Sequence, residues 1–131
     1  MKFPWIVIAA LMGGSAVILG AVGAHAVVGD EAGQRHHNLA VTYQMFHVTA
    51  LVLVVYILGK NNRGVLLANI GATLITVGVI LFSGSLYYLG WSGESAGYNM
   101  TPMGGLNLIC GWIALAIAGF QSWRGEVVAQ G

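Results

Sequence analysis

Charged side chains are scarce in this sequence, and their scarcity excludes most kinds of soluble protein. Asp, Glu, Lys and Arg make up 7% of the 131 residues and hydrophobic side chains 57%, whereas soluble domains average about a quarter and about half. We therefore expect an integral membrane protein. Five Lys or Arg residues against four Asp or Glu residues form no basic patch, so nucleic acid is not an expected partner.

Cysteine is almost absent as well. Cys110 is the single cysteine of the chain, which excludes an intrachain disulfide. Because it falls within a hydrophobic run, it points neither to redox chemistry nor to a compartment.

Four hydrophobic runs are each long enough to cross a bilayer as a helix, which takes about 20 apolar residues. They cover approximately residues 4–24, 40–59, 65–89 and 103–123. The first run also resembles a secretory signal, because Lys2 precedes it and Ala24-His25-Ala26 follows it like a small-residue cleavage site. It is longer than the apolar core of a usual signal, so we expect it to remain as a transmembrane span. The sequence predicts one domain, residues 1–131, that is an all-α membrane protein with four transmembrane helices in a left-handed antiparallel bundle.

The few charges predict an orientation for this bundle. Four spans place both termini on one side, together with most of the cations: Lys2, Lys60, Arg63 and Arg124. The opposite loops hold Arg35 and three carboxylates, Asp30, Glu31 and Glu94. The excess of Lys and Arg in cytoplasmic segments predicts that both termini are cytoplasmic, in a multi-pass protein of a bacterial inner (plasma) membrane.

The three connections differ in length. Residues 60–64 predict a tight polar turn, whereas residues 27–39 and 90–102 are longer and carry most of the hydrophilic side chains. In the first long connection we expect a short helix lying in the membrane interface. In the second we expect an irregular loop with Trp91 and Tyr98 as interfacial anchors and Pro102 at the start of the last helix.

Each span carries a stripe of residues at alternating spacings of three and four, the seam of a left-handed bundle. The first and last stripes are rich in small residues: Ala9, Gly13, Ala16, Gly20 and Gly23, then Gly104, Asn107, Gly111, Ala114, Ala118 and Gln121. The second and third are more polar: His36, Ala40, Tyr43, His47 and Ala50, then Asn69, Thr73, Thr76, Ile80, Ser83 and Tyr87. We expect Asn69, Thr73, Thr76 and Asn107 to stabilise the bundle through hydrogen bonds between helices.

The second span contains a polar triplet, Tyr43, Gln44 and His47, on one face of the helix. A histidine within a span usually faces the bundle interior or a wet cavity. The topology brings further polar side chains of the other spans to the same outer level. We expect one hydrogen-bonded cluster lining a shallow outward pocket for a lipid, a quinone-like ligand or water, made of His25, Tyr43, Gln44, His47, Ser83, Ser85, Tyr87 and Thr101.

The chemistry open to this cluster is limited, because the spans contain no Asp, Glu, Lys or Arg. Acid–base work would fall to His47 or His25, no hydroxyl has a recognisable base, and no HExxH pattern occurs. We therefore expect no enzyme and no metal site. Haem or copper binding remains an alternative, because imidazole and thioether side chains suit these groups and several lie toward the outer side: His25, His36, His37, His47, Met45, Met100 and Met103.

Four short segments resemble a known family, the small four-span bacterial inner-membrane proteins called domain of unknown function four-two-three, or YgdD-like. The segments are Gly20-Ala21-Val22-Gly23-Ala24-His25, Tyr43-Gln44-Met45-Phe46-His47, Phe82-Ser83-Gly84-Ser85-Leu86-Tyr87 and Thr101-Pro102-Met103-Gly104-Gly105. The resemblance covers nearly the whole chain and implies a four-helix membrane fold, but no activity. The family usually has a Gly-Leu-Lys-like segment after the histidine, where this chain has Ala26-Val27-Val28-Gly29.

Taken together, these patterns predict a non-enzymatic membrane protein. Small-residue stripes and minimal loops favour an accessory or scaffold subunit of a membrane complex, or a homo-oligomer, with membrane lipid and other membrane subunits as partners and no identified cofactor. The alternative from another class is a small-molecule or ion permease built from several copies, in which the polar cluster would be the binding site.

Overall fold

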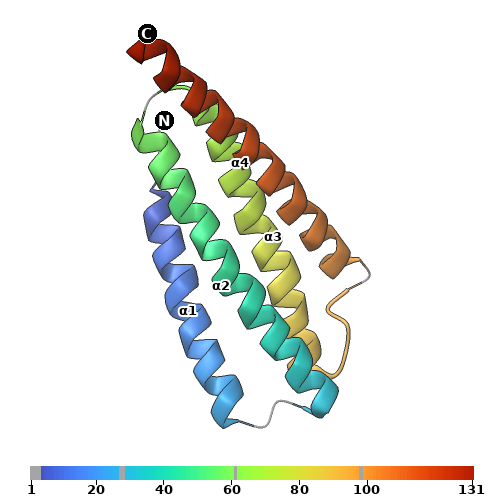
Figure 1. Cartoon of the computed structure of the whole chain (residues 1–131). Helices are drawn as coiled ribbons and strands as arrows, with labels where there is room; N and C mark the ends of the chain where they lie inside the picture. The colour runs from blue at the N-terminus through green and yellow to red at the C-terminus, as the bar shows by residue number, and fades with distance from the viewer. Residues whose placement is uncertain (1–3, 27–28, 61, 98) are drawn as a thin grey trace.

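The computed structural model describes residues 4–26, 29–60, 62–97 and 99–131 as a bundle of four antiparallel helices (Figure 1). These are α1 (Trp5–His25), α2 (Glu31–Lys60), α3 (Val65–Ser92) and α4 (Met100–Gln130). Each is long and apolar enough to cross a membrane, and the described residues include no strand. The predicted all-α membrane fold with four spans is confirmed.

Helix α2 begins nine residues before the predicted span, at Glu31 rather than at residue 40. Asp30 starts it, because its Oδ1 accepts a hydrogen bond from the Gly33 N–H at 2.8 Å and its carbonyl accepts one from the Gln34 N–H at 3.0 Å. An aspartate in this position is a strong helix start. The prediction of a separate interfacial helix over residues 27–39 was therefore wrong for residues 31–39, which are the first turns of α2.

The other helices also extend beyond their predicted spans. Helix α3 continues to Ser92 and ends at Gly93, whose φ of 72° is the left-handed conformation that terminates many helices. Helix α4 begins at Met100, before Pro102, and continues to Gln130. Four residues named in the predictions, Lys2, Val27, Val28 and Tyr98, lie outside the described residues.

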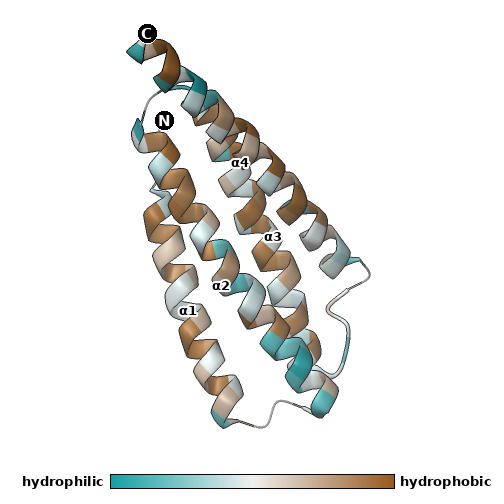
Figure 2. Ribbon diagram, viewed as in Figure 1, coloured by the Kyte–Doolittle hydropathy of each residue, from teal (hydrophilic) through white to brown (hydrophobic). Residues whose placement is uncertain are grey.

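Consecutive helices form the main contacts, so that α2 and α3 lie in the centre while α1 packs on α2 and α4 packs on α3 (Figure 1). The α2–α3 turn and the end of α4 lie at one end of the bundle, here called the terminal end. The α1–α2 and α3–α4 connections lie at the other, here called the loop end. Figure 2 shows brown, apolar ribbon along the middle of the helices and more teal ribbon toward both ends.

The closest helix contact joins α3 to α4 through reciprocal notches, in which a glycine of one helix accepts a large side chain of the other. A Cβ atom at Gly78 would lie 2.7 Å from the Leu108 side chain, and one at Gly111 would lie 2.6 Å from Ile75. The same pairing recurs seven residues away in each helix, where the Leu115 side chain lies against Gly71 and the backbone and Cβ of Phe82 lie against Gly104. A spacing of seven residues is the repeat of left-handed helix packing.

Small residues also bring α1 close to α2. Ala9, Ala16 and Gly23 of the predicted first stripe are buried, and Val41 of α2 lies 3.5 Å from where a Cβ of Gly20 would be. The predicted small face of the first span is therefore its packing face.

Replacing Gly104 by alanine is expected to destabilise the α3–α4 interface, because the new methyl group would overlap the backbone of Phe82. Overpacking of this kind costs about 1–3 kcal/mol. Reversible unfolding in detergent, followed by circular dichroism, would measure it. Gly14→Ala is the matched control, since nothing lies within 4 Å of its Cβ position. Equal stability of Gly104→Ala and the unmodified protein would contradict this packing.

Candidate functional site

Gln44 ties three helices together. Its Nε2 donates to the Met12 carbonyl at 2.9 Å and to the Ser15 hydroxyl at 2.8 Å, both on α1. Its Oε1 accepts a hydrogen bond from the Tyr87 hydroxyl of α3 at 2.8 Å. Both N–H groups of this amide and its oxygen are therefore engaged within the protein, so we assign Gln44 and Tyr87 to the packing of α1, α2 and α3.

Three more of the predicted site residues make bonds between helices. Ser83 donates to the Ala40 carbonyl at 2.9 Å and links α3 to α2. The hydroxyls of Ser85 and Thr101 lie 2.6 Å apart and link α3 to α4. These bonds do not connect with those of Gln44, so the eight predicted residues do not form one hydrogen-bonded cluster.

His25 stands apart from the rest of the predicted site. It is the last residue of α1 and is exposed at the loop end. No hydrogen bond joins it to any of the other seven predicted site residues, all of which the structure describes.

A different histidine, His37, is fully buried, at 0% exposure, between α1 and α3. Its Nε2 lies 2.8 Å from the Leu19 carbonyl, and its Nδ1 accepts a hydrogen bond of 3.1 Å from the Trp91 indole N–H. A carbonyl can only accept and an indole N–H can only donate, so the ring is neutral and carries its proton on Nε2. Sequence reasoning missed this residue because it placed residues 27–39 in a surface segment.

The signal that would have found His37 is the helical spacing of positions 37, 40, 44 and 47, all of which are buried on α2. Gly23 provides the space for the ring, since a Cβ at that position would overlap the His37 side chain. The Tyr87 ring lies 5.2 Å away between centroids. His37 thus fastens the loop end of α1 to the α2–α3 pair.

Tyr43 and His47 face another part of the molecule, a cavity of about 430 Å³ between α2 and α4. Its walls carry five further rings or bulky apolar chains from three helices, and we call it the aromatic groove. It is lined by Thr42, Tyr43, Phe46, His47, Phe82, Gly105, Leu108, Ile109 and Trp112.

The rings of the aromatic groove contact one another along one wall. Centroid distances are 4.4 Å for Tyr43 with Phe82, 5.8 Å for Phe46 with Trp112 and 6.0 Å for His47 with Trp112. These distances fall in the range that aromatic pairs prefer. The groove therefore offers flat, apolar surfaces with a small number of polar atoms among them.

His47 supplies one of those polar atoms. Its Nδ1 lies 2.6 Å from the Tyr43 carbonyl and must donate to it, which leaves Nε2 as an acceptor when the ring is neutral. No fully buried side-chain nitrogen or oxygen of the described residues lacks a partner, so Nε2 reaches accessible space although the residue is 3% exposed. Three other predicted site residues, Gln44, Ser83 and Tyr87, line a smaller cavity of about 380 Å³ between α1 and α3, but their amide N–H groups and hydroxyl donors are already used within the protein. Tyr43 and His47 are the predicted site residues that line the aromatic groove.

The aromatic groove lies deeper than the predicted outer pocket. Gln44, beside it on α2, bonds to Ser15, the middle residue of α1. On α4 the groove reaches Trp112, close to the middle of the predicted span at residues 103–123. A ligand that forms hydrogen bonds with Tyr43 or His47 would therefore do so within the apolar part of the bundle.

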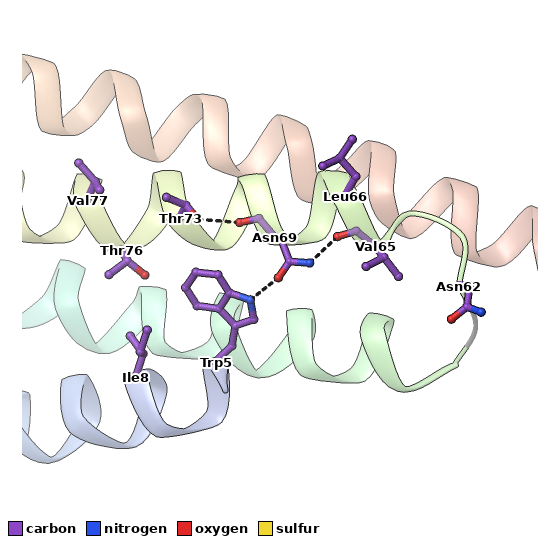
Figure 3. A pocket seen from close by; sticks show the side chains of 9 residues that line it. All are labelled: Trp5, Ile8, Asn62, Val65, Leu66, Asn69, Thr73, Thr76 and Val77. Atoms are coloured by element: carbon purple, nitrogen blue, oxygen red, sulfur yellow. Dashed lines mark hydrogen bonds between the residues drawn. The ribbon is translucent and has the colours of Figure 1, made fainter. Parts of the chain in front are cut away.

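A second groove runs between α1 and α3 on the other side of the molecule (Figure 3). Its larger part has a volume of about 780 Å³, and an adjoining cavity of about 380 Å³ shares Ile8 and Thr76 with it. The Trp5 indole donates to Asn69 Oδ1 at 2.7 Å, and Asn69 Nδ2 donates to the Val65 carbonyl at 2.8 Å.

The threonines of this α1–α3 groove are engaged as well. Thr73 and Thr76 donate to carbonyls of their own helix at 2.9 and 2.8 Å, as Asn107 does on α4 at 2.9 Å. The prediction of hydrogen bonds between helices is therefore confirmed for Asn69, which accepts from Trp5 of α1. It was wrong for Thr73, Thr76 and Asn107, because a hydroxyl or amide in a helix can reach the carbonyl four residues earlier. The α1–α3 groove is larger than the aromatic groove, but these bonds use the donors of Trp5, Asn69, Thr73 and Thr76.

The histidines named for the haem or copper alternative lie in different surroundings. Among the described residues, no three His, Cys, Asp or Glu side chains come together as a metal ligand set. Both ring nitrogens of His37 form hydrogen bonds within the protein. His47 lines the aromatic groove, which His37 does not line.

Replacing Gly23 by alanine is expected to push the His37 ring out of its place and to weaken its bonds to Leu19 and Trp91. We expect the free energy of unfolding to fall by about 1–3 kcal/mol, measured by reversible unfolding in detergent followed by circular dichroism. Gly20→Ala is the control, because its Cβ would make an ordinary contact with Val41 at 3.5 Å. Equal stability of Gly23→Ala and the unmodified protein would contradict the proposed fit.

Comparison with known proteins identifies the family. The model of a family described as "Protein of unknown function (DUF423)" matches residues 19–105. The UPF0382 membrane protein SAB0533 of Staphylococcus aureus is 39% identical over 122 residues, which is 89% of this chain and 95% of the relative. A UPF0382 membrane protein of Haemophilus influenzae is 32% identical over 93% of this chain and 98% of its own length.

A third relative, the UPF0382 membrane protein YwdK of Bacillus subtilis, is 35% identical over 87% of this chain and 94% of its own length. No solved structure matches the chain. The resemblance seen in the four short segments is confirmed: the chain belongs to the DUF423 family, and it is similar over most of its length to the UPF0382 membrane proteins.

Proposed function

We propose that this protein is a non-enzymatic, multi-pass membrane protein that holds one ring-bearing lipid, of the quinone or quinol class, in the aromatic groove. The observation that carries the proposal is the accessible Nε2 of His47 within a wall of aromatic rings. Pockets that bind small ligands are mostly apolar, with a few placed polar groups, and measure about 300–1,000 Å³. A cavity of about 430 Å³ lies within that range.

The polar atoms favour a particular head group. With its proton on Nδ1, His47 can only accept through Nε2, so it suits a ligand hydroxyl such as that of a quinol. The Tyr43 hydroxyl, on a side chain that is 38% exposed, can donate or accept and suits either a hydroxyl or a carbonyl oxygen. The ligand ring would stack against Phe82 or Trp112, and an apolar tail would lie along exposed Ile109 and Phe46 toward the lipid.

Binding without catalysis is the better-supported role for this site. His47 bonds to a backbone carbonyl rather than to a carboxylate, and its nearest ring neighbours are aromatic. A proton relay would require a further titratable partner. We therefore place the protein among accessory or scaffold subunits, or homo-oligomers, in which a bound lipid completes the packing.

The proposal includes a location and an orientation. The excess of cations at the terminal end supports cytoplasmic termini in a bacterial inner membrane. The outer face of α1, which packs chiefly on α2, is available to other membrane subunits or to a second copy.

A permease is the second candidate, and the α1–α3 groove favours it. This groove and its adjoining cavity extend from Asn62 near the terminal end to Tyr87 near the loop end. It opens sideways along the bundle, so a second copy would have to close it into a path. Solute flux into liposomes that contain the protein, lost on replacing Asn69 but not His47, would favour the permease over lipid binding.

The proposal is tested with native mass spectrometry of the full chain, extracted gently from its own membrane and then loaded with a menaquinone or ubiquinone in oxidised or reduced form. We expect one bound molecule per chain. His47→Phe should weaken quinol binding by about tenfold, the effect of one lost hydrogen bond of about 1.4 kcal/mol. His25→Phe is the matched control, because His25 is exposed and lies outside the groove.

Thermal unfolding of the same variants separates binding from stability. His47→Phe should keep the unfolding temperature of the ligand-free protein while losing the rise that quinol produces. Equal quinol binding by His47→Phe and the unmodified protein, or no retained small molecule in either, would refute the proposal.

A further inference from the structure

The terminal end of the bundle carries more positive than negative side chains. Lys60, Arg63 and Arg124 lie there with one carboxylate, Glu126, whereas the other carboxylates of the chain, Asp30, Glu31 and Glu94, belong to the loop end. The Oε1 atom of Glu126 lies 2.9 Å from the Lys60 ammonium. Positive side chains among these residues outnumber carboxylate side chains, so this end carries a net positive side-chain charge.

Both arginines line the same cavity. It has a volume of about 350 Å³ and is formed by Arg63, Gly64, Gln121 and Arg124 at the contact between the α2–α3 turn and α4. Like charges that share one cavity repel each other, and an anion between them removes the repulsion. Gln121 adds an amide that can donate to the same anion.

Two glycines bring these arginines together. Gly64, at φ 79°, lies so close to the Ala118 carbonyl that a Cβ there would overlap it, which holds the turn against α4. The Arg63 side chain then crosses α4 at Gly125, where a Cβ would lie 2.7 Å from its Cδ atom. The close contact of the turn with α4 thus places Arg63 beside α4, where it lines the same cavity as Arg124.

The cavity also lies at the level expected for lipid head groups. Exposed Phe120 and Trp123 flank it on α4, and the Arg124 guanidinium lies 5.9 Å from the centroid of the Phe120 ring. Aromatic rings with basic side chains beside them are typical of the membrane interface. Beyond this point α4 continues past the other helices (Figure 1), and Figure 2 shows teal, hydrophilic ribbon there.

From these observations we propose that Arg63, Gln121 and Arg124 bind the phosphate group of an anionic phospholipid at the terminal end of the bundle. Guanidinium groups match phosphate oxygens with paired hydrogen bonds. The N-terminus of α3, which begins at Val65 and has no side-chain cap, adds a favourable partial positive charge at the edge of the cavity. This site is separate from the aromatic groove and does not depend on the ligand proposed there.

The test uses the full chain in nanodiscs or detergent with equal amounts of phosphatidylglycerol and phosphatidylethanolamine, read by native mass spectrometry. The unmodified protein should retain phosphatidylglycerol preferentially. The double variant R63Q and R124Q should lose about tenfold or more of that preference, since each basic residue near an anionic surface contributes several-fold. Circular dichroism checks that the variant keeps its helices.

The matched control is R35Q, which removes one arginine from the loop end, where Arg35 forms an exposed ion pair with Glu31 at 3.0 Å. It should bind phosphatidylglycerol like the unmodified protein. Unchanged preference in the double variant, or equal loss in R35Q, would overturn the site. Binding of inorganic phosphate at the same arginines without retained phospholipid would overturn the assignment to a lipid.

Discussion

Inside a bilayer a polar side chain is costly unless it finds a partner, and this constraint explains most of the bundle. Gln44 uses both of its N–H groups and its oxygen to join three helices. Ser83, Ser85 and Thr101 use their hydroxyls to join α3 to its two neighbours. Once these bonds are accounted for, Tyr43 and His47 in the aromatic groove stand out, because their remaining polar atoms face a cavity rather than another helix.

The two grooves follow from the way the helices are arranged. Because α2 and α3 occupy the centre, α1 and α4 lie at opposite edges, and each leaves a recess against the helix that it does not fully contact. In the recess beside α1, the Trp5 indole and the Asn69 amide form a hydrogen bond with each other. The recess beside α4 is lined by rings and keeps an open acceptor on His47. The α1–α3 groove is the larger of the two, but we favour the aromatic groove as a ligand site because of the acceptor on His47 and the rings around it.

Much of the fold could be predicted from sequence, because hydrophobic length and small-residue spacing report directly on spans and on close helix contacts. The small faces of α1 and α4 were predicted in this way and are packing faces. The notches at Gly71 and Gly78 were missed, since sequence does not reveal which of two faces of α3 meets α4. The start of α2 was also missed, although Asp30 is a recognisable helix cap.

The candidate site was predictable only in part, for a geometric reason. Sequence gives the depth of a residue along a helix, but the direction of its side chain depends on where the neighbours lie. Gln44 and His47 are three positions apart, or about 60° around the helix, and this difference directs one toward α1 and α3 and the other toward α4. The single predicted cluster is therefore divided in the structure: Gln44 bonds to α1 and α3, whereas His47 lines the aromatic groove beside α4.

The attachment of α1 has a consequence for how the bundle assembles. The α3–α4 contact is formed by helices adjacent in the chain and needs no other part of the protein. The hydrogen bonds that fix α1 at Ser15 and Leu19 come instead from Gln44 and His37, whose own partners Tyr87 and Trp91 belong to α3. Since inserted helices associate after they have crossed the membrane, α1 precedes α2 and α3 in the chain but can form this set of bonds only once both of them are in place.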